Sequence, residues 1–374
     1  MYRKSALFVI YLVILPLILQ PHEITAKQQY IISLNHLNSN VEQVMIPMRD
    51  GIRLATDIYF PSNHEEEKKY PVILTRTPYN KNQFLNTNPT DLIYIVQDVR
   101  GRFASEGLDM VFLNASTDGF DTIKWISEQP WCNGRIATEG TSASGINQYF
   151  LQIAEPPNLK AQSILVACPD LYQHALYQGG AFRESLIVGW LTAIDSTEFL
   201  PTIYAHETFS SLWENVTLKE QYQKVQAPAI HVAGWFDCFQ QGTIEGFMGY
   251  QYNSSNDVRG KSYLLIGPWT HGGWNTRKQG EILFPENSVV DYYGQLYEDF
   301  FNYYLFEENS QLESQPKIRY YCMGAPLTGN YGNFWRTTEQ WPIPVNYTNW
   351  YFHGNNLLSS TKPDTDSLSQ SFLY

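Results

Sequence analysis

A run of small residues around Ser142 has the composition of a nucleophilic turn. The apolar strand pattern of residues 136–139 leads into it, and a helical pattern begins directly after the serine. Small side chains let the strand and helix backbones approach closely, which exposes a serine hydroxyl above the sheet. Gly140 lies two positions before the serine, but Ser144 stands two positions after it and Gly145 follows one position late. The pattern predicts a nucleophile elbow at Ser142, and a turn without a catalytic role is the alternative.

A serine nucleophile requires a base, an acid that orients the base, and donors for the developing oxyanion. In proteins with such an elbow, the acid and the histidine follow the serine, each on a loop after a later strand. Two loops meet this description: the strand pattern of residues 229–234 runs into Asp237, and that of residues 263–267 runs into His271. We therefore predict Asp237 as the acid and His271 as the base, with Asp257 as the alternative acid.

The eight histidines allow a direct comparison, because only His271 follows immediately after a buried strand pattern. His231 falls inside a strand pattern, where packing in the core is the expected role. The remaining histidines either precede the serine or lie in segments outside the strand–helix alternation: His22, His36, His64, His174, His206 and His353.

Two donors for the oxyanion are expected. The backbone N–H of Ala143 is one, because it belongs to the residue after the nucleophile. The second should come from the loop after the third strand, where Tyr79 follows a proline that stiffens the loop. A donor of this kind contributes about 3 kcal/mol of transition-state stabilisation. From the residues alone, Tyr79 is either this donor or a surface aromatic.

Alternating strands and helices must position these residues. Residues 44–48 and 52–60 predict a hairpin around Arg49-Asp50-Gly51. Further strands are expected at 72–76, 92–97, 136–139, 163–167, 229–234 and 262–267, and helices at 117–128, 143–153, 243–250 and 289–306. This order predicts an α/β fold with a mostly parallel sheet covered on both faces. The predicted acid and histidine then share the carboxyl edge of the sheet with Ser142.

The patterns also suggest how the chain is divided. The core is predicted in two parts, residues 40–168 and 227–308. Between them, residues 169–226 show no strand pattern, are rich in aromatic residues and predict a helical cap, with helices at 182–194 and 209–225. Residues 315–374 predict an incomplete β-sandwich, with short strands at 317–323, 334–336 and 349–352.

The first residues have the order of a targeting segment. Arg3 and Lys4 precede an apolar run that ends near Leu19, and Ala26 offers a small residue for cleavage. Residues 1–26 are thus predicted to be a signal peptide, which places the protein outside the cytoplasm. An uncleaved membrane anchor is the alternative, and no other membrane contact is expected.

Composition limits the partners. The chain has 374 residues and a formal net charge of −12, which argues against nucleic acid because such binding needs clustered Lys and Arg. The spacing of the four cysteines suggests no metal site, and they are expected either to pair or to remain free thiols. No cofactor and no metal are expected, and a homo-oligomer remains open.

Several further stretches match a known family in its own order. They are residues 44–51 (VMIPMRDG), 75–80 (TRTPYN), 97–101 (QDVRG) with 105–107 (SEG), 131–134 (WCNG), 140–142 (GTS), 180–182 (GAF), 234–237 (GWFD) and 267–271 (GPWTH). With them the chain resembles the cocaine esterase-like (CocE/NonD) hydrolases, which include α-amino acid ester hydrolases, glutaryl-cephalosporin acylases and X-Pro dipeptidyl-peptidases. The resemblance extends from about residue 42 to residue 350.

The resemblance implies an α/β-hydrolase fold with a helical cap and a C-terminal jelly roll. It implies Ser142 as nucleophile, Asp237 and His271 as its partners, and an oxyanion hole made by Tyr79 with the Ala143 amide. It further implies a serine acyl hydrolase that acts on a small ester, an amide or a short peptide.

Three departures from the family pattern narrow these expectations. Ala143 replaces the usual tyrosine after the serine, which alters the pocket wall. Cys238, Phe239 and Gln240 stand where members that bind an α-ammonium group carry acidic residues, so uncharged acyl esters or amides are favoured. The jelly roll is expected to be incomplete, and the long N-terminal domain of X-Pro dipeptidyl-peptidases is missing. X-Pro dipeptidyl-peptidase activity and an inactive binding protein on the same scaffold are therefore the alternatives.

Overall fold

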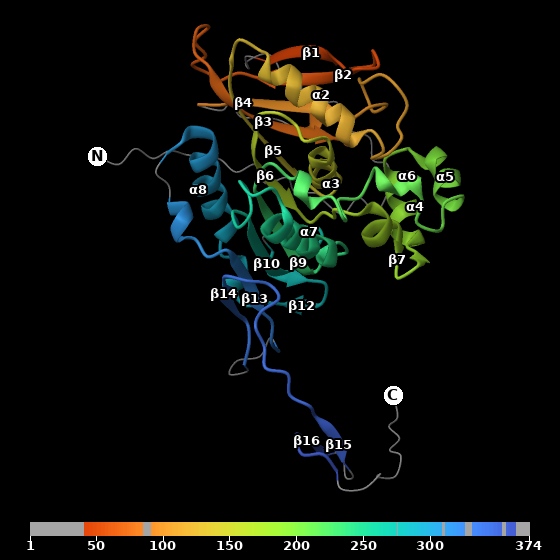
Figure 1. Cartoon of the computed structure of the whole chain (residues 1–374), viewed down its shortest axis with the longest axis vertical. Helices are drawn as coiled ribbons and strands as arrows, with labels where there is room; N and C mark the ends of the chain where they lie inside the picture. Colours follow the sequence, from red (N-terminus) through yellow and green to blue (C-terminus); the bar gives the residue numbers. More distant parts are fainter. Residues whose placement is uncertain are drawn as a thin grey trace.

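The fold is built on one ten-stranded sheet (Figure 1). The computed structural model describes residues 41–84, 91–274, 276–308, 311–325, 331–353 and 357–363. The sheet has the strand order β1-β2-β4-β3-β5-β6-β9-β10-β13-β14. Its strands are β1 (Val41–Pro47), β2 (Arg53–Tyr59), β3 (Tyr70–Thr77), β4 (Ile93–Asp98), β5 (Cys132–Thr141), β6 (Leu159–Leu165), β9 (Ala229–Phe236), β10 (Tyr263–Thr270), β13 (Ile318–Cys322) and β14 (Phe334–Thr338).

The pairing of the strands is mostly parallel, as predicted. β1 and β2 form the predicted antiparallel hairpin, and β2 pairs antiparallel with β4. From β4 through β3, β5, β6, β9 and β10 every pairing is parallel. All the parallel strands therefore end at one edge of the sheet, which is where ligands bind in open α/β sheets.

Helices cover both faces, because successive strand residues point to opposite sides. On one face lie α2 (Ala115–Ser127), α3 (Ala143–Leu151) and α7 (Gln240–Asn253), and on the other lies α8 (Tyr292–Phe306). Within β5, Ile136 joins the apolar cluster that contains Ile123 of α2. The next residue, Ala137, joins the cluster that contains Tyr297 of α8. The sheet is therefore the middle layer of three.

The cap segment differs from the prediction in one helix and in a short hairpin, because we expected no strand there. It contains α4 (Glu184–Ala193), α5 (Leu200–Tyr204), α6 (Ser211–Glu214) and a short hairpin of β7 (Tyr177–Gln178) and β8 (Ala181–Phe182). The helix predicted over residues 209–225 is wrong, because only α6 and a 3-10 turn at Tyr222–Lys224 form there. Thr217 instead bridges to Asp170, and Leu218 N–H donates to the Pro169 carbonyl. These backbone bonds close the base of the cap and are incompatible with a continuous helix.

The strands after residue 317 also lie elsewhere than predicted. We expected residues 317–323 and 334–336 to begin a separate sandwich, but β13 pairs parallel with β10, and β14 pairs antiparallel with β13. Ile318 and Tyr320 enter the same apolar cluster as Leu264 of β10, which explains why they extend the central sheet. A hairpin of β15 (Tyr351–His353) and β16 (Leu357–Ser359) pairs only with itself and lies away from the main body (Figure 1).

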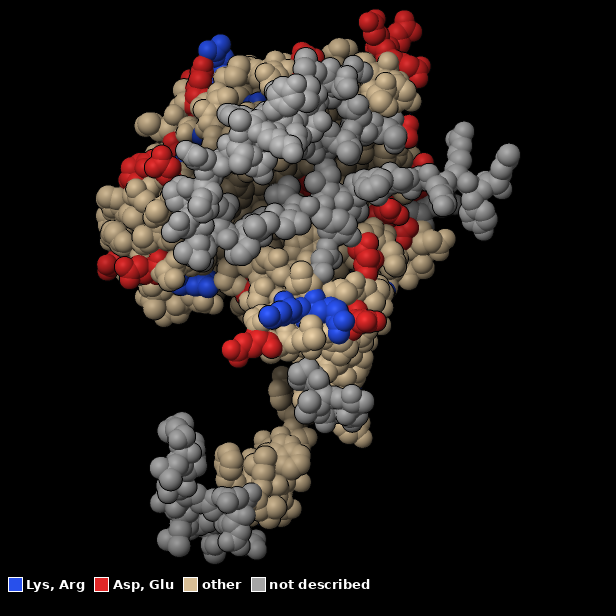
Figure 2. Space-filling model, turned by 180° about the vertical axis from the view of Figure 1, so that it is seen from behind, with Lys and Arg blue, Asp and Glu red and all other residues tan. Residues whose placement is uncertain are grey.

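The structure bears on the expectations about the leader and the cysteines to different extents. The predicted signal peptide lies outside the described residues. In the part of the chain that is described, no helix is long and apolar enough to cross a bilayer. The four cysteines are free thiols, which settles the alternative between pairing and free thiols. Figure 2 shows the molecule from behind, where acidic side chains lie at several places around the rim and a group of basic side chains lies together in the lower part, beside acidic ones.

Candidate active site

Ser142 lies at the sharp turn between β5 and α3. Its backbone has φ 57° and ψ −123°, a conformation that is rare for a non-glycine residue and costs roughly 1–3 kcal/mol. The turn is held from both sides, because Ser142 N–H donates to the Leu165 carbonyl and the Ser142 carbonyl accepts from Ile146 N–H. The surrounding backbone thus maintains the strained geometry of a nucleophile elbow.

Two glycines make this turn possible. A Cβ atom on Gly140 would lie 2.7 Å from the Ser144 backbone, and one on Gly145 would lie 2.8 Å from the Ala167 side chain. Gly145 therefore performs its packing role one position later than the usual pattern. Ser144, with its small side chain, is tolerated in between.

The loops after β9 and β10 bring the predicted partners to this serine. Asp237 follows β9 directly, and His271 follows β10 directly. His271 Nδ1–H donates to Asp237 Oδ1 at 2.6 Å, and the Ser142 hydroxyl donates to His271 Nε2 at 2.8 Å. The Asp237 side chain is fully buried, whereas that of His271 is 34% exposed. The imidazole is therefore partly open to solvent, whereas the serine and the acid are buried.

The neighbours of His271 determine the pKa of its imidazole. Burial disfavours the protonated His271, but the hydrogen bond and charge of Asp237, with a smaller effect of Cys238, outweigh burial and raise the pKa of His271. The Cys238 Sγ lies 3.7 Å from His271 Nδ1. The Phe239 ring packs edge-on against the imidazole, with centroids 5.5 Å apart. The Asp237 Oδ2 atom has no hydrogen-bond partner among the described residues.

The predicted oxyanion donors also lie next to the serine. The Tyr79 hydroxyl is within hydrogen-bonding reach of the Ser142 side chain and of the Ala143 backbone amide. Trp190 of α4 donates its indole N–H to the same hydroxyl at 3.0 Å. Burial raises the pKa of Tyr79, so the phenol keeps its proton and can donate.

The alternatives considered for these roles lie elsewhere. Asp257 is exposed in the segment between α7 and β10. His231 is fully buried in β9, as expected for a packed side chain, and its Nδ1 lies 2.8 Å from the Tyr149 hydroxyl. Burial lowers the pKa of His231 to about 3.

Sequence reasoning did not find Trp190, and it did not place Cys238 next to the imidazole. Cys238 follows the predicted acid, so its proximity had a weak signal in the sequence. Trp190 had none, because it is one of several aromatic residues in the cap and lies 111 positions from Tyr79.

A side chain set that could share a metal ion coincides with this cluster. Within the described ranges, Asp237, Cys238 and His271 are the one group of three whose ligand atoms lie within 4.8 Å of one another. In that set, His271 Nδ1 is already hydrogen-bonded to Asp237 Oδ1. The same atoms therefore belong to the hydrogen-bonded chain from Asp237 through His271 to Ser142.

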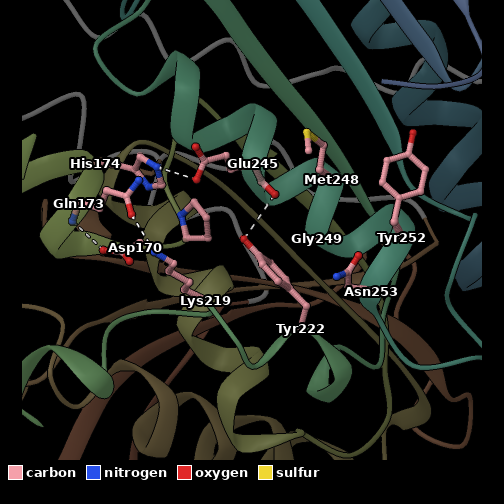
Figure 3. A pocket seen from close by; sticks show the side chains of 11 residues that line it. Asp170, Gln173, His174, Lys219, Tyr222, Glu245, Met248, Gly249, Tyr252 and Asn253 are labelled. Atoms are coloured by element: carbon pink, nitrogen blue, oxygen red, sulfur yellow. Dashed lines mark hydrogen bonds and ion pairs between the residues drawn. The ribbon is translucent and has the colours of Figure 1, made fainter. Parts of the chain in front are cut away.

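A cavity of about 250 Å³ lies apart from this site, between the base of the cap and α7 (Figure 3). Its charged groups have polar partners. His174 Nε2 lies 3.0 Å from Glu245 Oε2, and Asp170 accepts hydrogen bonds from the Thr217 hydroxyl and the Gln173 backbone N–H. It includes neither the serine nor its partners.

The strained serine turn, the imidazole and the buried carboxylate on a mostly parallel three-layer fold define the class as an α/β-hydrolase. The sequence profile of the X-Pro dipeptidyl-peptidase (S15) family matches residues 50–199 and 190–273. The chain therefore belongs to this family, which confirms the resemblance found in the sequence.

Individual relatives agree with this assignment. Cocaine esterase from Rhodococcus sp. (strain MB1 Bresler) is 27% identical over 86% of this chain, which spans 64% of that protein's length. An aminopeptidase from the marine sediment archaeon Thaumarchaeota archaeon has a TM-score of 0.71 at 24% identity, covering 88% of this chain and 63% of that one. An α-amino acid ester hydrolase has a TM-score of 0.69 at 20% identity, covering 88% and 64%. These structures share the fold.

Proposed function

We propose that this protein is a serine hydrolase that cleaves an ester or amide acyl bond through an acyl-enzyme intermediate. The observation that supports the proposal is the continuous hydrogen-bonded chain from Asp237 through His271 to the Ser142 hydroxyl, with distances of 2.6 and 2.8 Å. This is the arrangement that activates a serine by a general base held in one tautomer.

In the proposed mechanism, Ser142 Oγ attacks the acyl carbonyl while His271 Nε2 takes its proton. Asp237 keeps the imidazole oriented and stabilises its positive charge. The tetrahedral oxyanion accepts hydrogen bonds from the Ala143 N–H and the Tyr79 hydroxyl. His271 then protonates the leaving group, and a water molecule releases the acyl group by the same sequence of proton transfers.

The residues near the imidazole favour an uncharged substrate. The described neighbours of His271 after the acid are a thiol and an aromatic ring, Cys238 and Phe239, so no carboxylate stands there to hold an α-ammonium group. The sequence similarity to cocaine esterase independently supports an esterase. The second candidate is an X-Pro dipeptidyl-peptidase, which the family profile supports.

Labelling with a fluorophosphonate probe tests the proposal, because the probe reacts with an activated serine. We expect the wild-type protein to be labelled and Ser142→Ala to be unlabelled. Ser144→Ala, two positions further along the same turn, is the matched control and should still be labelled. An unlabelled wild-type protein would support an inactive binding protein instead.

The substrate class needs a second comparison. We expect faster hydrolysis of a short-chain nitrophenyl ester than of an X-Pro anilide, with both rates abolished in Ser142→Ala. A preference for the anilide would replace the esterase with the dipeptidyl-peptidase.

We also propose that residues 1–26 direct export. The order of basic, apolar and small residues supports this, and N-terminal sequencing of secreted protein should then start at Lys27. A protein that keeps residue 1 and remains with the membrane would contradict it.

A further inference from the structure

An indole of the cap is hydrogen-bonded to the predicted oxyanion donor. Trp190 lies on α4, and its Nε1–H donates to the Tyr79 hydroxyl at 3.0 Å. Tyr79 belongs to the loop after β3 in the core, so this bond joins two separate parts of the chain. None of the steps in the proposed mechanism uses Trp190.

The polarity of this bond determines where the phenol proton points. An indole N–H can only donate, whereas a phenol can both donate and accept. Because Trp190 fills an acceptor position of the Tyr79 oxygen, the hydroxyl proton must point elsewhere. The other neighbours of that oxygen are the Ser142 side chain and the Ala143 amide, and the amide can only donate as well. The serine side of the site is therefore where the proton is directed.

The indole itself is held firmly. It stacks on Phe112 with an interplanar angle of 2° and a centroid distance of 5.7 Å. Phe112 is buried and packs edge-on against Phe150 of α3, the helix that begins at the elbow. The indole is thus positioned by the same helix that positions the nucleophile.

The end of α4 is also tied to the core. Ser196, three residues after the helix, donates to Asp109 at 2.6 Å and accepts from Arg102 at 2.8 Å. Both partners belong to the loop after β4. These bonds limit how far the helix that carries Trp190 can move from Tyr79.

We propose that Trp190 is a positioning residue of the oxyanion hole. Its indole N–H holds the Tyr79 hydroxyl with the proton directed at the tetrahedral oxyanion, and it strengthens that hydroxyl as a donor because hydrogen bonds in a chain polarise one another. The oxyanion hole then has both donors correctly oriented only while α4 is packed against the core. This inference rests on the proposed function.

Trp190→Phe tests it, because phenylalanine keeps an aromatic ring on Phe112 and removes the N–H. We expect kcat for a nitrophenyl ester to fall roughly tenfold, the factor that corresponds to one ordinary hydrogen bond, with KM changed less than about twofold. Tyr79→Phe should lower kcat by about 10²-fold or more. In the Tyr79→Phe background, Trp190→Phe should have no further effect on kcat.

Trp213→Phe is the matched control. Trp213 lies in the same cap and donates its indole N–H to the His206 carbonyl instead, so its removal should leave kcat unchanged. Thermal unfolding of each variant checks that the fold is intact.

The inference is overturned if Trp190→Phe lowers kcat equally in both backgrounds, or if it changes KM alone, as a residue of the pocket wall would. These outcomes are separate from failure of the proposed function, which would appear as hydrolysis that survives Ser142→Ala.

Discussion

At the scale of single residues, the charges around His271 determine the pH range in which its imidazole is neutral. In the proposed mechanism, the imidazole must be neutral to accept the proton of Ser142, whereas its carboxylate partner stabilises the protonated form. Both effects come from the same 2.6 Å contact with Asp237. If the proposed roles hold, Asp237 therefore both orients the base and shifts the pH range in which the base is neutral.

This leads to a prediction for the pH dependence of kcat/KM. Because the pKa of His271 is raised above its ordinary value of 6.5, activity should rise with pH through a midpoint above 6.5. Asp237→Asn should move the midpoint down and lower kcat by several orders of magnitude. Asp257→Asn, which alters an exposed carboxylate elsewhere, should leave the profile unchanged. A midpoint at or below 6.5 in the wild-type protein would contradict the prediction.

His231 predicts a separate pH effect on stability. Its pKa is lowered to about 3 by burial, so the unfolded chain binds a proton between pH 6.5 and 3 that the folded chain does not. The free energy of unfolding should therefore fall as pH decreases through this window. His231→Leu should show a flatter dependence, although it leaves the Tyr149 hydroxyl without its partner. Urea unfolding at a series of pH values measures both slopes, and equal slopes would exclude this contribution.

At the scale of elements, the strand–turn–helix unit of β5 and α3 depends on close backbone contact. A Cβ at residue 140 would approach the Ser144 backbone to 2.7 Å, and the backbone there has no freedom to retreat because Ser142 is hydrogen-bonded on both sides. The conformation of the nucleophile and the packing of the helix are therefore inseparable.

Two glycine substitutions should act in opposite directions. Gly140→Ala should lower the free energy of unfolding by about 1–3 kcal/mol and lower kcat, because the turn must shift to accept the methyl group. Gly189→Ala lies within α4 with nothing within 4 Å of the new methyl group, so it should stabilise the protein by about 0.5–1 kcal/mol. Chemical denaturation and ester hydrolysis report the two quantities, and a neutral Gly140→Ala would show that the turn can adapt.

At the scale of the whole molecule, the central sheet extends beyond the strands that carry the site. The β13 residues Ile318 and Tyr321 are fully buried, and Trp235 of β9 donates its indole N–H to the Tyr321 carbonyl. The β15–β16 hairpin, in contrast, pairs with no other described strand. The two parts of the C-terminal segment therefore contribute differently to stability.

Truncations should separate these two contributions. Ending the chain after Pro344 removes the hairpin but retains β13 and β14, and the free energy of unfolding should change by less than about 0.5 kcal/mol. Ending it after Pro316 removes the buried strand residues as well, and should lower the free energy of unfolding by at least 4 kcal/mol, roughly the cost of emptying one large core site. Similar losses in both truncations would mean that the hairpin contributes to the main body.

The sequence predicted well whatever depends on neighbouring residues. The apolar strands, the helices beside them and the turn around Ser142 follow from side-chain periodicity and residue size over about ten positions. The helix expected over residues 209–225 failed for a physical reason, because Thr217 and Leu218 bond to the backbone at the base of the cap. No periodicity within that segment carries information about such partners.

By itself, the sequence determined the order of serine, aspartate and histidine and the strands that precede them, since each is encoded within a short stretch. Only the tertiary structure decided that β13 and β14 join the central sheet and that Trp190 bonds to Tyr79. These contacts join residues far apart in the chain, and their geometry depends on how the cap and the sheet pack together. Hydrogen bonds and close packing act over a few ångströms, so partners of this kind become visible only once the chain is folded.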